Sequence, residues 1–391
     1  MESMSKLVRR LTAKFYIFSF FDDFILIYPL YTVMFADSGL SPYKITSLLV
    51  AWSLTAFLLE VPAGALADKF PRRHVLIVGI VLRAIGYGFW FFQRTYVGFL
   101  IGFLLWGVKS ALTSGTEEAL VYDELNRVDN LSLYAKVTGK MQTLSMFAVV
   151  LASLGASTLA HRGYGLILVL SVTAVSVSGI AIYLLPKAPI VMANEETKYL
   201  KYLKEGIAAV VQKPKVLYIV MFMSVVAGLA SVDEYFSLFF KEKGYTNTGI
   251  AFWTAVIFMF AAVGSFFAHK LEDKKLPLTS LLVLWAILLF FAAIASKPLA
   301  PILLGFYFMF FAAVQVIFNA HLQKEVSDKI RATATSVGGL TSELLALVAF
   351  GIVGFGASVS DYSYGYKLIA VAVVLSAVTL YSYNLRAKVV L

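Results

Sequence analysis

The sequence predicts an all-α integral membrane protein with twelve transmembrane helices in two pseudo-symmetric six-helix bundles, with both termini in the cytoplasm. Hydrophobic residues make up 60% of the 391 residues and charged residues only 14%, and the mean hydropathy is +0.82. A soluble domain cannot hide so much apolar surface from water. Apolar runs of about 20 residues recur along the chain, and the longest polar connection lies midway between the first six and the last six.

Each apolar run is long enough to cross a bilayer as a helix. About 20 residues rising 1.5 Å each span roughly 30 Å of hydrocarbon. Membrane β-barrels need short segments that alternate apolar and polar residues, whereas these runs are continuously apolar. The predicted helices are, in order, 15–37, 45–67, 75–93, 97–119, 137–160, 164–185, 216–239, 247–268, 277–296, 299–320, 332–356 and 364–385.

The central polar connection divides the chain into three predicted regions. These are an N-terminal bundle over 1–185, a cytoplasmic linker over 186–214 and a C-terminal bundle over 215–391. Within the linker, Asn194 can cap a helix whose apolar residues share one face. This amphipathic helix either lies on the membrane surface or packs on the bundle as an ordinary linker helix.

The net charge of +10 reports topology and does not indicate a nucleic-acid partner. Most of the 33 Lys and Arg residues fall in the termini and the even-numbered connections, which places both in the cytoplasm by the positive-inside rule. The basic first 14 residues precede an apolar run that is too long for a signal peptide, so we expect a retained first helix. The chain contains no cysteine, which excludes disulfides and thiolate metal sites.

The two halves resemble one another, as internally repeated transporters do. The segment "MFADSGLSPYKIT" follows the first apolar run, and "LFFKEKGYTNTGIA" follows the seventh. Likewise "GALADKFPRR" follows the second run, and "GSFFAHKLEDKK" follows the eighth. These matches fall at equivalent places in the two halves, which indicates a duplicated six-helix unit.

The connection after the second run, "GALADKFPRRHVL", resembles the signature loop of the major facilitator superfamily, G-x-L-a-D-r-x-G-r-k-x-x-l. Only Pro71 departs from this pattern, in place of its second glycine. The position of the loop, the topology and the repeat agree with it, so the resemblance covers essentially the whole chain. The matching positions are Gly64, Leu66, Ala67, Asp68, Lys69, Arg72, Arg73 and Leu76.

The resemblance implies a secondary active transporter that works by alternating access. It is expected to act as a monomer in a bacterial or archaeal cytoplasmic membrane, moving a small molecule without a cofactor and with a proton gradient as its energy source. The signature loop would form a cytoplasmic latch, made by Gly64, Asp68, Lys69, Arg72 and Arg73. Its expected partners are Glu118, Asp123 and the start of the eleventh helix near Arg331.

Five charged residues lie inside apolar runs of the first half, where an ionisable group normally faces a partner or a water-filled cavity. They are Asp22 and Asp23 in run 1, Glu60 in run 2, Arg83 in run 3 and Lys109 in run 4. Adjacent residues point about 100° apart on a helix, so we expect one aspartate to pair and the other to face the cavity. Either these acids bind a proton or substrate, or the two bases hold them as fixed ion pairs. Lys109 is also a candidate anion ligand.

The second half contributes Glu343 as its best cavity candidate, near the middle of the eleventh run. Asp233 and Glu234 lie toward the outer end of the seventh run and are weaker candidates, with Lys241 and Lys243 as alternative ion-pair partners. Tyr28 is a further weak candidate because the adjacent Pro29 removes a backbone hydrogen bond and can bend the first helix.

Acids in an apolar cavity favour proton-coupled export of amphipathic or cationic compounds. The alternative is uptake of a nutrient, a siderophore-like chelate or another anionic solute, which Arg83 and Lys109 favour. Two signatures of drug–proton antiporters are also missing, because Phe103 stands where they carry an arginine and the fifth run has no proline. A membrane receptor or an intramembrane enzyme is less favoured, because the chain has no H-E-x-x-H, nucleophile elbow or phosphate-binding loop.

Overall fold

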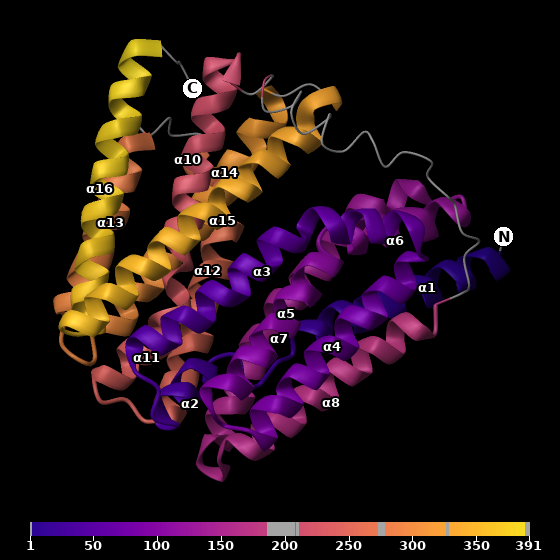
Figure 1. The fold of residues 1–391 in the computed structure, drawn as a ribbon. Coiled ribbons are helices and arrows are strands. Elements are labelled where there is room, and N and C mark those ends of the chain that lie inside the picture. Colours follow the sequence, from indigo (N-terminus) through magenta and orange to yellow (C-terminus); the bar gives the residue numbers. More distant parts are fainter. Residues whose placement is uncertain (1, 186–207, 209–210, 273–277, 326–327, 388–391) are drawn as a thin grey trace. The chain divides into compact units, whose positions relative to one another are not determined.

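The computed structural model describes residues 2–185, 208, 211–272, 278–325 and 328–387. The described residues form helices joined by short turns, without strands (Figure 1). Ten of these helices or helix pairs are long and apolar enough to cross a membrane. The chain is therefore an integral multi-pass membrane protein. The predicted linker helix falls almost entirely outside the described residues.

The chain divides into two compact units. The first contains residues 1–40, 47–194 and 246–255, and the second contains 41–46, 195–245 and 256–391. Each unit is described separately below. The predicted boundaries of the bundles, 1–185 and 215–391, stay a prediction.

The first half of the chain supplies eight α-helices. Within it, α4 packs against α5 and α8, and α1 packs against α7 and α8. The helices are α1 (Glu2–Asp23), α2 (Tyr31–Asp37), α3 (Pro42–Lys69), α4 (Arg72–Phe92), α5 (Tyr96–Thr113), α6 (Thr116–Arg127), α7 (Tyr134–Leu159) and α8 (Tyr164–Tyr183).

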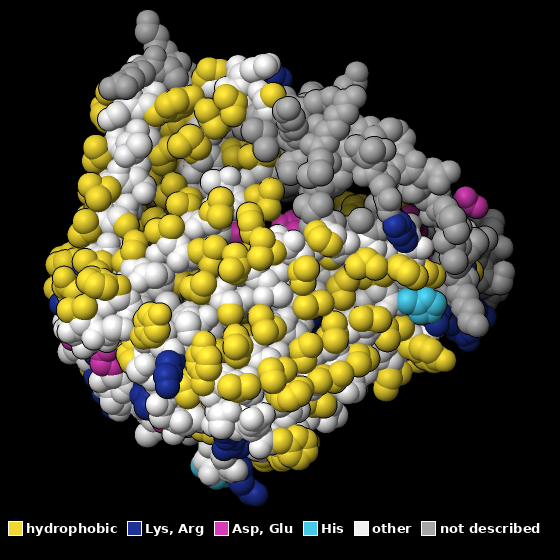
Figure 2. Space-filling view, viewed as in Figure 1, with side chains coloured by type: hydrophobic (Ala, Val, Ile, Leu, Met, Phe, Trp, Pro, Cys, Tyr) yellow, Lys and Arg dark blue, Asp and Glu magenta, His cyan; other side chains and the backbone are white. Residues whose placement is uncertain are grey.

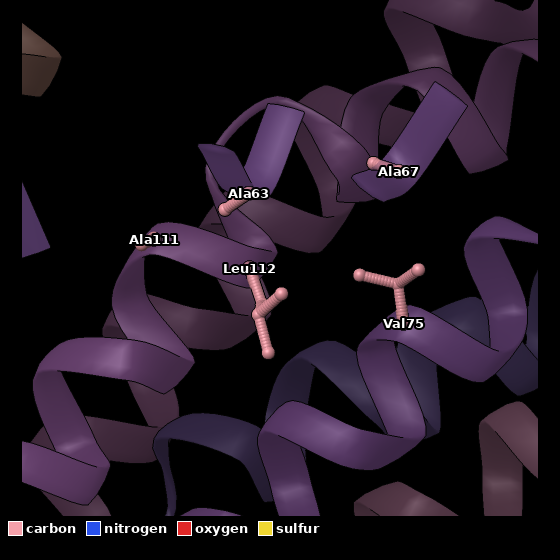
Figure 3. Close-up of a cluster of buried hydrophobic side chains, with 5 residues drawn as sticks. All are labelled: Ala63, Ala67, Val75, Ala111 and Leu112. Atoms are coloured by element: carbon pink, nitrogen blue, oxygen red, sulfur yellow. The ribbon is translucent and has the colours of Figure 1, made fainter. Parts of the chain in front are cut away.

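Small residues bring the signature-loop ends of α3, α4 and α5 together. Ala63 and Ala67 on α3 contact Val75 on α4 and Ala111 and Leu112 on α5 in one buried cluster (Figure 3). Short side chains allow helix backbones to approach closely in a membrane. The loop between α3 and α4 is thus anchored by packing on both sides.

The second half repeats this arrangement. Its helix α10 packs against α14, α15 and α16, and α13 packs against α14 and α16. The helices are α10 (Pro214–Ala230), α11 (Phe236–Glu242), α12 (Asn247–Glu272), α13 (Leu278–Ile294), α14 (Ala300–Glu325), α15 (Asp328–Val359) and α16 (Tyr362–Ala387), and a 3-10 turn, η3 (Ser231–Tyr235), joins α10 to α11.

Three of the predicted continuous helices are interrupted. Run 15–37 breaks between α1 and α2, where Pro29 lies, and the helix extends back to Glu2. Run 97–119 breaks at Gly115, whose φ of +69° ends the α-helical path, and continues as α6. Run 216–239 is interrupted by η3. Hydropathy did not reveal these breaks. The first lies in the apolar residues 24–30, and the other two are short segments within longer apolar runs.

The interruptions of runs 15–37 and 216–239 show the internal repeat at the level of single residues. The short helices that follow them, α2 and α11, both have seven residues, and a glycine with positive φ lies just beyond each, at Gly39 and Gly244. The last residue of each short helix is an acid that binds the first residue of a later helix. Asp37 accepts a hydrogen bond from the Tyr164 hydroxyl of α8, and Glu242 accepts one from the Tyr362 amide of α16.

The molecular surface suits a lipid environment. Figure 2 shows hydrophobic side chains spread over the described part of the visible face, with few Lys or Arg among them. Large apolar side chains such as Phe92 and Phe266 are 86% and 72% exposed. Water disfavours an apolar surface of this extent, whereas lipid tails do not.

Candidate functional site

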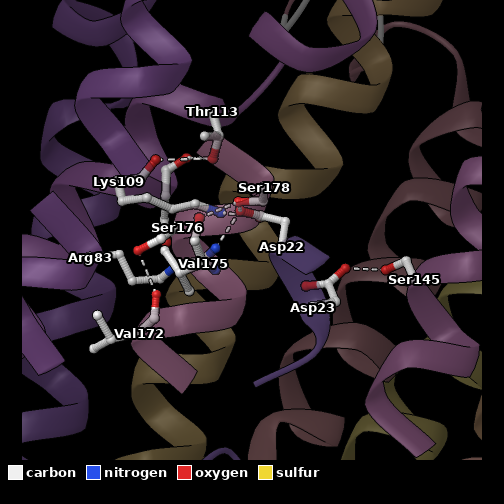
Figure 4. A network of polar contacts seen from close by, with 11 residues as sticks. Asp22, Asp23, Arg83, Lys109, Thr113, Ser145, Val172, Val175, Ser176 and Ser178 are labelled. Carbon is white, nitrogen blue, oxygen red and sulfur yellow. Dashed lines mark hydrogen bonds and ion pairs between the residues drawn. The ribbon is translucent and has the colours of Figure 1, made fainter. Parts of the chain in front are cut away.

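The first unit contains a buried ion cluster centred on Asp22. The Asp22 carboxylate accepts a hydrogen bond from the Arg83 guanidinium of α4, and the Lys109 ammonium of α5 lies 3.0 Å from its other oxygen. The Ser178 hydroxyl of α8 donates to the same carboxylate over 3.3 Å. Asp22 and Arg83 are only 7% and 2% exposed. Figure 4 shows the two cations converging on this one carboxylate.

The end of α1 explains why two cations gather here. Asp22 and Asp23 are the last two residues of α1. The C-terminus of a helix carries partial negative charge from its unpaired carbonyl groups, so two carboxylates at that end repel it. Arg83 and Lys109 offset this repulsion. The chain beyond the helix is tied down by an amide–hydroxyl hydrogen bond of 3.0 Å from Ile27 to Ser171.

Asp23 points away from the cations. Its carboxylate accepts a hydrogen bond from the Ser145 hydroxyl of α7, as Figure 4 shows. It is less buried than Asp22, and both aspartates line a cleft of about 570 Å³ in the first unit. As expected for adjacent helical residues, Asp22 is paired with bases. The hydrogen bond to Asp23 comes from the neutral Ser145 hydroxyl.

The cleft wall carries four carboxylates and neither Lys nor Arg among the described residues that line it. Glu117 and Glu118 join the two aspartates there. Both glutamates lie in the first turn of α6, where the helix dipole stabilises negative charge. That helix terminus exists because Gly115 interrupts run 97–119, between α5 and α6. The remaining lining residues are Ser19, Val121, Tyr134, Ala135, Thr138, Gly139, Met141, Gln142 and Ser145.

The other predicted cavity residues do not join this cleft. Glu60 is half-buried on α3 and Tyr28 lies in the interruption of helix 1. Glu343 is exposed on α15 in the second unit. Asp233 and Glu234 lie in η3, also in the second unit. Lys243 donates instead to the carbonyls of Ala293 and Ala295.

The signature loop begins in the last turns of α3, with Gly64, Asp68 and Lys69, and ends in the first turn of α4. Arg72 forms an ion pair with Asp123 of α6, one of the two acids that we expected it or Arg73 to reach. Arg73 instead donates to the Leu185 carbonyl over 2.6 Å and lies over the Tyr183 ring.

Two residues of the expected latch have side chains that the structure does not describe. The side chains of Asp68 and Arg331 lie outside the described part of the structure, although both residues are in helices, α3 and α15. Glu118 lines the cleft. The latch therefore stays a prediction.

Comparison with known proteins identifies the family. A sequence model described as the Major Facilitator Superfamily matches residues 15–350. The chain belongs to the Major Facilitator Superfamily. Secondary transport of a solute is accordingly its general function, as the signature loop indicated. No curated protein matches the sequence.

Solved structures of this superfamily share the fold across nearly the whole chain. The nucleoside transporter NupG has a TM-score of 0.77 at 15% identity, covering 95% of this chain and 98% of NupG. A D-xylose–proton symporter has a TM-score of 0.74 at 18% identity, covering 96% and 97%. A bacterial homologue of the lysosomal transporter Spinster, facing inward and unoccupied, has a TM-score of 0.72 at 16% identity, covering 98% and 96%. At such low identity the likeness shows the fold alone.

The sequence reasoning missed part of the site. Glu117 was not singled out, although it stands beside Glu118 in "SGTEEAL". The glycine before this pair is the available signal, because a glycine followed by two acids is typical of a helix start. Ser145 and Ser178 carried no signal, since serine is common on membrane helices and only packing shows which serines meet Asp22 and Asp23.

Proposed function

We propose that this transporter exports small cationic, amphipathic solutes in exchange for protons. The observation that carries the proposal is the cleft wall, on which four carboxylates gather without a Lys or Arg among the described lining residues. Arg83 and Lys109 are engaged by Asp22, so they offset one acid and leave Asp23, Glu117 and Glu118 to attract a cation. Val121, Tyr134 and Met141 supply apolar surface for the rest of such a solute.

Export follows from competition for the same carboxylates. A proton bound to a cleft acid removes the negative charge that holds the cation, and a bound cation displaces protons. Sites that hold either proton or cation exchange one for the other, and an inward proton gradient then drives the cation outward. The engagement of both bases by Asp22 makes an anionic solute, the alternative expected from Arg83 and Lys109, less well supported.

The test is proton release in proteoliposomes that contain a trapped pH dye. Adding a cationic solute from a panel of cationic, neutral and anionic compounds should release protons from wild type. The response should fall at least tenfold in Asp23→Asn and in Glu117→Gln. The control is Asp129→Asn, which lies outside the cleft and whose φ of 52° suits asparagine. Proton-linked entry of an anionic or neutral solute would instead establish the importer alternative.

A further inference from the structure

The turn η3, which interrupts the path from α10 to α11 in the second unit, contains Asp233, whose surroundings differ from those of Asp22. This interruption corresponds by the internal repeat to the one between α1 and α2, since α2 and α11 match in length and in the glycine that follows them. Asp22 is held by two cations, whereas Asp233 has no Lys or Arg partner among the described residues. The backbone amides of Asp233 and Glu234 lie near its carboxylate.

Two buried polar groups without partners lie on α13 and α14, in the same unit as this acid. Tyr307 of α14 is fully buried and Trp285 of α13 is 1% exposed, and their rings stack with centroids 4.7 Å apart. Neither the Tyr307 hydroxyl nor the Trp285 indole nitrogen has a hydrogen-bond partner in the described structure. A buried polar group without a hydrogen-bond partner destabilises the folded state. Tyr307 packs beside the interruption, because its ring centroid lies 6.4 Å from that of Phe236, three residues after Asp233.

The hydroxyl groups of two other tyrosines around η3 have hydrogen-bond partners. The Tyr235 hydroxyl lies 2.9 Å from the Thr46 hydroxyl and 3.3 Å from the Phe350 carbonyl. The Tyr366 hydroxyl donates to the Val232 carbonyl over 3.3 Å. The unsatisfied groups therefore gather on one side, toward α13 and α14.

The charged and titratable groups around Asp233 include no base in the described structure. Glu234 and Tyr235 share its segment. Tyr307 of α14 and Tyr366 of α16 pack against Phe236, with ring centroids 6.4 Å and 6.1 Å from it. A carboxylate at membrane depth without a countercharge has a large desolvation cost. Binding a proton removes that cost. It also gives the carboxyl group an O–H that can hydrogen-bond a tyrosine oxygen.

We propose that η3, the interruption between α10 and α11, is a second proton-binding site, in which Asp233 takes up the proton and the Tyr307 hydroxyl hydrogen-bonds the resulting carboxyl group. The proton comes from a hydronium ion, which becomes water as its O–H bond breaks and an O–H bond forms on the carboxylate. As a coupling site it rests on the proposed proton-linked exchange. It adds one transported proton to those exchanged at the cleft, and so raises the number of protons moved per solute.

The first test needs no substrate. Infrared difference spectra of the purified full-length protein, taken between acid and alkaline pH, should show a carboxyl C=O band that disappears in Asp233→Asn. Tyr307→Phe should keep the band and shift it, because a hydrogen bond to that group is lost. Tyr366→Phe and Glu234→Gln should leave the band in place.

Three results would overturn the proposal. One is a band unchanged in Asp233→Asn, and another is a band lost in Glu234→Gln instead. The third is loss of the band when sodium is added at constant pH, which would make this a metal-cation site. If Asp233→Asn does not fold, Tyr307→Phe decides the question, because it preserves the ring packing, and an unshifted band in that variant then rejects the proposal.

A flux measurement separates this inference from the proposed function. With tetraphenylphosphonium as the cationic probe, the membrane potential that stops net flux gives the number of protons exchanged per cation. Asp233→Asn should exchange one proton fewer than wild type. Absence of any proton exchange in wild type would reject the proposed function, whereas an unchanged ratio in Asp233→Asn would reject only the second site's coupling role.

Discussion

Asp22 and Asp23 are neighbours in sequence but differ in what holds their charge. Asp22 contacts Arg83, Lys109 and Ser178, so its ionised form is surrounded by donors. Asp23 contacts the neutral Ser145 and borders the cleft. Removing a partner from a buried ion pair leaves the other charge uncompensated, which is more costly than the pair's own contribution to stability. Asp22 is therefore suited to a structural role and Asp23 to exchange of proton and solute.

This difference predicts unequal losses of stability for two matched substitutions. Asp22→Asn should destabilise the protein by about 3–5 kcal/mol, because two cations lose their counter-charge. Asp23→Asn should change stability by less than about 1 kcal/mol, since an amide oxygen still accepts the Ser145 hydrogen bond. Thermal unfolding of the purified variants in one detergent measures both. Equal losses of stability would show that Asp22 is not the structural member of the pair.

Interruptions and close crossings of helices determine where the functional side chains lie. The break after Asp23 ends α1 among the bases, and the break at Gly115 creates the α6 terminus that carries Glu117. The helices that hold Arg83 and Lys109 must also approach closely. They cross at Gly86 of α4 and Gly102 of α5, where a Cβ on Gly86 would lie 2.9 Å from the Gly102 carbonyl oxygen.

We expect the Gly86→Ala substitution to destabilise the protein by about 1–3 kcal/mol, because the added methyl group must push two helix backbones apart. Gly88→Ala on the same helix is the matched control, since a Cβ there meets nothing within 4 Å. It should be neutral or slightly stabilising, as alanine favours a helix by about 1 kcal/mol over glycine. Unfolding temperature and proton-linked flux should both fall only in the Gly86 variant. Similar behaviour of the two variants would contradict the role of this crossing.

Two properties belong to the whole molecule, the internal repeat and the placement of its basic residues. The repeat is visible both in the helix pairings of each half and in the matched acids Asp37 and Glu242. Basic residues concentrate in the connections and termini that the positive-inside rule places in the cytoplasm. Because the protein contains no cysteine, this orientation can be tested on the otherwise unchanged chain.

Single-cysteine labelling should reveal the predicted sidedness. Thr246→Cys lies in the turn after the seventh run and is exposed, so a membrane-impermeant maleimide should label it on intact cells. Ser132→Cys lies between the fourth and fifth runs, is also exposed, and should react only after the cells are permeabilised. The reverse pattern would invert the topology, and with it the assignment of the signature loop to the cytoplasm.

The sequence by itself determined the membrane class, the helical fold, the internal repeat and the family. These depend on local properties, namely the length of apolar runs, the distribution of basic residues and one short loop motif, which survive without knowledge of any contact. It also singled out Asp22, Asp23, Arg83 and Lys109, because charge inside an apolar run is conspicuous in one dimension.

Only the tertiary structure decided which charge meets which. Arg83 and Lys109 lie 61 and 87 residues from Asp22 along the chain, and hydropathy does not record the rotation of one helix against another. The breaks in runs 15–37, 97–119 and 216–239 were also not predicted, because the average hydropathy of a run does not record where the backbone leaves the helical path. The orphaned hydroxyl of Tyr307 is apparent only once every neighbour is in place, since hydrogen-bond satisfaction is a property of packing and not of composition.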